Sequence, residues 1–101
     1  MAWQRVGEAS AIKPGEVRGL EFGSSLIAVY RLGDAFYATD NLCTHEFSLL
    51  SDGYVEGDKV ECALHQAIFH IPTGQVIDGP TDKSLKTYPT KVENGVVFVD
   101  V

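Results

Sequence analysis

The chain has 101 residues, 45% of them hydrophobic, and a formal net charge of −6 at pH 7. This length predicts a single domain with a modest core, and the composition fits a soluble globular protein. The negative charge argues against nucleic acid or an anionic membrane as a partner.

The N-terminal sequence predicts no secretory signal. Residues 1–6 contain no apolar segment of the kind that signal peptides require. No run in the chain approaches the roughly eighteen apolar residues of a spanning helix. A protein without membrane association is therefore expected.

Short β-strands are predicted along the first 42 residues. The turn-rich segment 8–15 has room for one helical turn, and Gly23-Ser24-Ser25 and Gly33-Asp34 predict tight turns. The strands predicted from β-forming residues and alternation are 2–6, 16–22, 26–32 and 35–38.

Glycine and proline become frequent between residues 43 and 83. Short strands alternate with turns in this segment, which indicates a small inserted β subdomain. The predicted strands are 54–55, 59–62, 68–71 and 75–77, joined by turns at 56–58 and 72–74.

The last part of the chain is expected to return to the main sheet. Strands are predicted over 85–93 and 96–101, joined by Asn94-Gly95, the strongest hairpin signal of the sequence. No segment longer than about one turn has the apolar period of a helix. The sequence therefore predicts an all-β protein in one domain, 1–101. Its antiparallel sandwich-like base (1–42 and 84–101) would carry a subdomain of about 43–83.

Both cysteines and two of the three histidines lie in one pattern, Cys43-x-His45 followed by Cys62-x-x-His65. Each pair combines a soft thiolate with an imidazole, which suits a transition metal or an iron–sulfur centre. Two such loops that face each other would supply four ligands. The same set could bind structural zinc, although zinc sites usually pair Cys with Cys and His with His. A Cys/His nucleophilic pair is a third alternative, weakened because no third orienting group is evident.

The similarity to one known family extends beyond these four residues. The sequence resembles Rieske proteins, in particular the soluble ferredoxins that serve bacterial aromatic-ring dioxygenases. Glu46 and Ala67 depart from the family pattern, which often has Gly at these positions. The similar segments are Cys43-Thr44-His45, Ser51-Asp52-Gly53-Tyr54, Glu61-Cys62, Leu64-His65, Phe69, Thr73-Gly74, Gly79-Pro80 and Lys86-Thr87-Tyr88-Pro89.

The resemblance implies a Rieske-type fold and one [2Fe–2S] cluster per chain. One iron would be held by Cys43 and Cys62, and the other iron by His45 and His65. With both cysteines used as thiolate ligands, a reducing cytoplasm is the expected location. A monomer is expected.

The resemblance also implies an electron carrier and not an enzyme. The chain would accept one electron at a time from an NADH-dependent flavoprotein ferredoxin reductase and pass it to the terminal oxygenase. Oxygen activation would need a mononuclear iron held by two histidines and one carboxylate. Only His70 is left once the cluster has its ligands, so this chain cannot build that site.

Several residues next to the ligands are expected to surround the cluster. In the family, the proline loop that corresponds to Asp78-Gly79-Pro80 covers the cluster, whereas these residues alone predict only a turn. High-potential respiratory members have Ser and Tyr two and four places after the second histidine, where this chain has Ala and Phe. The expected cluster environment is Glu46, Phe47, Gln66, Ala67, Phe69 and Pro80.

The remaining candidate residues are expected to be structural. His70 should be an ordinary strand residue that faces solvent. Trp3, Tyr30, Phe36 and Tyr37 should lie in the core or on sheet faces and not form a docking site.

Two alternative functions remain open at this point. Nitrite reductase small subunits share the Rieske fold, and identification of the larger partner in a native complex would distinguish them. A zinc-stabilised interaction module is the second alternative. Colour distinguishes it, because a zinc protein is colourless and a Rieske protein is red-brown.

Overall fold

The computed structural model describes residues 2–44, 48–64, 66–79 and 81–101. Within these ranges the chain forms strands and two 3₁₀ turns, Ala9–Ala11 and Leu50–Asp52, with no α-helix. The predicted all-β class is confirmed. The strands are β1 (Trp3–Glu8), β2 (Val17–Phe22), β3 (Ser25–Leu32), β4 (Ala35–Asp40), β5 (Tyr54–Glu56), β6 (Lys59–Glu61), β7 (Ile68–His70), β8 (Val76–Asp78), β9 (Thr87–Tyr88), β10 (Thr90–Glu93) and β11 (Val96–Asp100).

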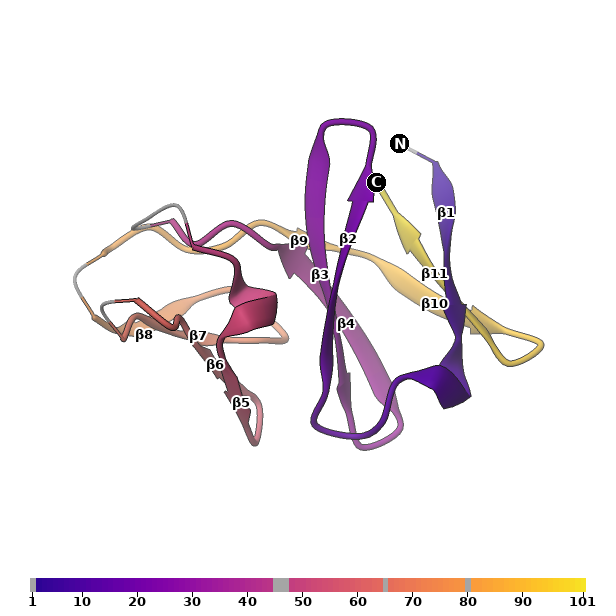
Figure 1. Cartoon of the computed structure of the whole chain (residues 1–101), viewed down its shortest axis with the longest axis horizontal. Coiled ribbons are helices and arrows are strands. Elements are labelled where there is room, and N and C mark those ends of the chain that lie inside the picture. The colour runs from indigo at the N-terminus through magenta and orange to yellow at the C-terminus, as the bar shows by residue number, and fades with distance from the viewer. Residues whose placement is uncertain (1, 45–47, 65, 80) are drawn as a thin grey trace.

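The strands form three antiparallel sheets. Two of them, in the orders β1-β11-β10 and β2-β3-β4-β9, combine strands from both ends of the chain. The third, β5-β6-β7-β8, uses only strands between residues 54 and 78. Figure 1 shows this third sheet on the left of the view, apart from the first two. No helix in the described ranges is long and apolar enough to cross a membrane.

Strand β3 lies between two hydrophobic cores. Ile27 and Val29 pack with residues of β1, β4 and β11, whereas Ala28 and Tyr30 pack with residues of the third sheet. All four side chains are buried. Because successive residues of a strand point to opposite faces, β3 must be apolar on both, which explains its continuous apolar run.

Pro89 divides the segment predicted as one strand over 85–93. β9 precedes it and pairs with β4, and β10 follows it and pairs with β11. Proline has no N–H for a strand ladder, but its carbonyl oxygen accepts a 2.9 Å hydrogen bond from the N–H of Asp100. The prediction of one strand was therefore wrong, because the chain changes sheets at this residue.

The predicted Asn94-Gly95 hairpin is confirmed. Both residues have positive φ, 51° and 76°, as a type I′ turn requires. Tyr30 is fully buried, as expected. Trp3 lies on a sheet face and is 43% exposed, with the Lys91 ammonium 4.5 Å from the centre of its ring.

Candidate metal centre

The structure describes part of the predicted ligand set. Cys43 and Cys62 are buried in the same hydrophobic core, which also contains Ala67 and Phe69. The predicted ligands His45 and His65 lie outside the described residues. So do three residues of the predicted cluster environment, Glu46, Phe47 and Pro80.

The first loop brings Cys43 from the end of β4 into this core. The Cys43 N–H donates a 2.9 Å hydrogen bond to the carbonyl oxygen of Ser48. Leu42 and Leu49 form an antiparallel bridge one position further out. The two sides of the loop are therefore paired close to the thiol, so the position of Cys43 depends on local hydrogen bonds.

The second loop places Cys62 directly after β6. The Cys62 N–H donates a 2.8 Å hydrogen bond to the carbonyl oxygen of Ala67, the residue before β7. Gln66 is exposed and has a φ of 54°, a left-handed conformation that helps the chain to turn sharply. Cys62 and Ala67 are both completely buried.

A third segment, which follows β8, contacts both loops. A Cβ added to Gly79 would lie 2.6 Å from the Ala67 Cα, so the third segment packs directly against the second loop. Thr44 in the first loop donates a 2.8 Å hydrogen bond to the Lys83 carbonyl oxygen, and its hydroxyl lies 3.3 Å from that of Thr81. These contacts hold the three segments together at one end of the third sheet.

Two buried thiols on separate loops fit a group that accepts two thiolate ligands. Thiolate is the form of cysteine that binds metal, and soft sulfur ligands suit iron–sulfur clusters. The small side chain of Ala67 and the bare backbone of Gly79 allow the loops to approach each other beside these thiols. The described residues are therefore compatible with the predicted cluster.

The end of β4 is fixed by polar side chains that the sequence did not reveal. The Tyr30 hydroxyl lies 2.8 Å from that of Thr39, and the Tyr88 hydroxyl donates to the Asp40 carboxylate. Burial, with the neighbouring Asp40, raises the pKa of Tyr88 to about 12, so this phenol keeps its proton at neutral pH. Burial also raises the pKa of Tyr30. These contacts stabilise the strand that leads to Cys43.

His70 has two polar partners, which its position in an alternating strand did not predict. Its Nε2 lies 3.0 Å from an Asp58 carboxylate oxygen and its Nδ1 lies 2.8 Å from the Thr73 hydroxyl. The ring thus connects the β5–β6 turn with the turn after β7. The expected solvent-facing orientation is correct in part, because the side chain remains 31% exposed.

A family model described as the Rieske [2Fe-2S] domain matches residues 2–89. The chain belongs to the Rieske [2Fe-2S] family. The family prediction is confirmed, and membership implies a [2Fe–2S] cluster.

Relatives of this Rieske chain agree in length and fold. It is 41% identical to the ferredoxin component of a naphthalene 1,2-dioxygenase system from Pseudomonas putida, over 98% of this chain and 95% of that protein. A solved complex of oxygenase and ferredoxin in carbazole 1,9a-dioxygenase contains a chain with 39% identity and a TM-score of 0.93. That match covers 96% of this chain and 91% of the other. A Sphingomonas yanoikuyae B1 ferredoxin has 35% identity and a TM-score of 0.92, with 99% of each chain covered.

Proposed function

We propose that this chain is the ferredoxin component of an aromatic-ring dioxygenase system, and that it carries single electrons from a flavoprotein reductase to a terminal oxygenase. The observation that carries the proposal is the burial of Cys43 and Cys62 on adjoining loops of a Rieske chain. Relatives with 39–41% identity along almost the whole chain have this role or are solved with an oxygenase. In this role the chain supplies electrons and does not itself oxidise the aromatic compound.

The proposed cofactor is one [2Fe–2S] cluster per chain, which stores one electron when it is bound. Its ligands would be Cys43 and Cys62 on one iron and His45 and His65 on the other. Neutral imidazole in place of two thiolates makes the centre less negative and therefore easier to reduce. Residues of about 43–83 would form the cluster-binding subdomain, supported by a base made of 1–42 and 84–101. We place the protein in the cytoplasm, where thiol ligands stay reduced.

The chain's own residues would exclude water and position the electron-transfer surface. Ala67 and Phe69 are completely buried beside Cys62, so they would form an apolar wall. Gln66 is exposed at the turn between Cys62 and Ala67. We expect it to lie on the docking rim together with Glu46, Phe47 and Pro80.

The electron-transfer role is tested by mixing the reduced protein with the terminal oxygenase of a naphthalene dioxygenase system in a stopped-flow instrument. Wild-type protein should reduce the oxygenase, and Gln66→Lys should slow this step without a change in the visible spectrum. Electron-transfer interfaces are small, so one added charge should have a measurable effect.

Gln75→Lys is the matched control for the rim. Gln75 is exposed in the turn between β7 and β8, at the opposite end of the third sheet from Ala67 and Gly79. The Gln75→Lys variant should transfer electrons to the oxygenase at the wild-type rate. Equal slowing by both variants would place the docking site elsewhere, and no transfer from wild type would contradict the role.

The reduction potential gives a second prediction. Hydroxyl groups that donate hydrogen bonds to cluster sulfurs raise the potential, and neither Ala67 nor Phe69 can donate from its side chain. We expect a potential near the low end of the Rieske range, roughly −150 mV, and upward shifts in Ala67→Ser and Phe69→Tyr. Protein-film voltammetry measures the wild-type potential and the shift in each variant. A wild-type value well above zero would contradict this explanation.

The alternatives rank lower. A nitrite reductase small subunit has less support, because the relatives with the stated identities belong to dioxygenase systems. A zinc-stabilised module would leave the Rieske similarity over residues 2–89 unexplained. Isolation of the native complex and the colour of the protein distinguish these two from a ferredoxin.

A further inference from the structure

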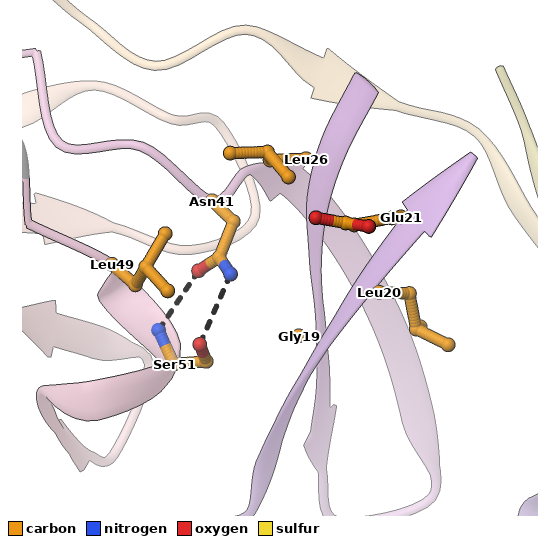
Figure 2. A pocket seen from close by; sticks show the side chains of 7 residues that line it. All are labelled: Gly19, Leu20, Glu21, Leu26, Asn41, Leu49 and Ser51. Carbon is orange, nitrogen blue, oxygen red and sulfur yellow. Dashed lines mark hydrogen bonds between the residues drawn. The ribbon is translucent and has the colours of Figure 1, made fainter. Parts of the chain in front are cut away.

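Asn41 lies between the end of β4 and Cys43 and is only 3% exposed. Its side chain makes two hydrogen bonds to the same residue, as Figure 2 shows. The Asn41 Oδ1 accepts from the Ser51 N–H at 2.8 Å, and the Asn41 Nδ2 donates to the Ser51 Oγ at 3.0 Å. We call this pair of contacts the Asn41–Ser51 bridge.

The backbone of Asn41 is also fixed on both sides. Its N–H donates to the carbonyl oxygen of Leu26 in β3 at 2.8 Å, and its carbonyl oxygen accepts from the Leu50 N–H at 2.7 Å. Asn41 therefore joins the base to the 3₁₀ turn Leu50–Asp52 through main chain and side chain together. The predicted ligand Cys43 lies only two residues further along the chain.

The Asn41–Ser51 bridge joins the two ends of the first loop. Inside it, Leu42 and Leu49 pair, and the Cys43 N–H bonds to Ser48. The loop so enclosed carries two of the four predicted ligands, Cys43 and His45. Without the bridge, the two sides of the loop would keep their main-chain hydrogen bonds but lose the side-chain contact between them.

Gly19 in β2 leaves the space that the bridge occupies. A Cβ at this position would lie 2.8 Å from both the Asn41 Nδ2 and the Ser51 Oγ. Its φ is not in the left-handed region, so space and not backbone conformation explains the glycine. Three residues from separate parts of the chain thus form one packed unit. They line a pocket together with Leu20, Glu21, Leu26 and Leu49, and Figure 2 shows the side chains of all seven residues.

We infer that Asn41 is a positioning residue for the cluster, because the Asn41–Ser51 bridge, packed against Gly19, sets where the first loop presents Cys43. This inference rests on the proposed function, since it presumes that Cys43 is a ligand of a cluster. It goes beyond ligand assignment, because Asn41 acts through the loop and not on the metal. Outer residues that orient ligands typically change metal affinity about 10- to 100-fold when they are removed.

The central variant is Asn41→Ala. It leaves the Ser51 N–H and hydroxyl without their partner in a partly buried place, so the two ends of the first loop should separate. We expect the cluster to be released to a chelator about tenfold faster or more, with a shifted reduction potential and an altered EPR spectrum of the reduced protein. Bleaching of the visible absorbance gives the release rate.

Three further variants test whether the bridge acts as a unit. Ser51→Ala keeps its N–H and should have a smaller effect, and the double variant should be no worse than Asn41→Ala. Gly19→Ala should reproduce the effect by steric overlap. Asn41→Asp should restore slow release, because the carboxylate can accept from both the Ser51 N–H and the Ser51 hydroxyl.

Two controls separate positioning from general loss of stability. Val97→Ala removes buried apolar contacts from the core between β1, β4 and β11, which contains neither cysteine and no residue of the first loop. Gly23→Ala, at the end of the β2–β3 hairpin, introduces strain at a φ of 63° with no atom within 4 Å of the new Cβ. Both should destabilise the base while the potential and the EPR spectrum remain those of wild type.

The outcome distinguishes this inference from the proposed function. If wild type holds the cluster and Asn41→Ala matches the two controls in release rate, potential and EPR spectrum, the positioning role is wrong and the function stands. If wild-type protein holds no iron, both the positioning inference and the proposed function are wrong. Should Asn41→Ala not fold, Ser51→Ala gives the same test, with wild-type values overturning the inference. Hydrogen exchange adds a readout independent of redox activity: the Leu50 and Ser51 amides should lose protection while β3 keeps it.

Discussion

Cys43→Ser should abolish iron binding and remove the hydrogen-exchange protection of β5–β8, while the β3 amides remain protected. The free energy of ligand binding becomes folding free energy when a site is not formed in the unfolded chain. The third sheet has strands of only three residues, whereas β3 has eight and is buried on both faces. The part that holds the cluster should therefore depend on it more than the base does.

The measurement is hydrogen exchange with mass spectrometry on purified protein, with iron analysis of the same sample. Cys62→Ser should behave in the same way. Ala63→Ser is the matched control, because Ala63 is exposed in the second loop and a serine there removes no proposed ligand. Equal protection of β5–β8 in wild type and Cys43→Ser would contradict the expected dependence on the cluster.

Gly79→Ala should have the next largest effect. The new Cβ would lie 2.6 Å from the Ala67 Cα, at a φ of +117° that side chains rarely adopt. The overlap is with backbone and cannot be relieved by a rotamer change. Strain and overpacking together should lower the free energy of unfolding by roughly 2–5 kcal/mol. The third segment should separate from the second loop, and the cluster should be lost.

Gly57→Ala is the control for this prediction. Its φ of +60° is also positive, but no atom lies within 4 Å of the added Cβ, so only conformational strain of about 1 kcal/mol is expected. The guanidinium midpoint for loss of visible absorbance, with the iron content at zero denaturant, compares the two variants. Similar values for both would show that the contact with Ala67 is unimportant.

The sequence predicted features that depend on residues close to one another along the chain. Asn94-Gly95 specified its turn because both central residues must adopt positive φ, and the Cys/His spacing pointed to the Rieske family before any contact was known. Alternation of apolar residues gave strands but could not assign them to sheets. The change of sheet at Pro89 depends on which partners β9 and β10 find in space.

The sequence could not predict contacts between distant residues at the site. Asn41 and Ser51 are ten positions apart, and both residue types are common in ordinary turns. The need for glycine at 19 and 79 appears only when another segment is seen to lie against each backbone. Such contacts depend on the packing of complete sheets, and sequence periodicity carries no information about them.

The proposed electron-transfer role requires that this chain hold a Rieske cluster through two cysteines and two histidines. EPR of the dithionite-reduced protein, with iron and acid-labile sulfide analysis of the same sample, tests it most directly. We expect two irons and two sulfides per chain, a red-brown oxidised protein and an EPR signal that appears on one-electron reduction. A colourless protein with stoichiometric zinc and no EPR signal would contradict it.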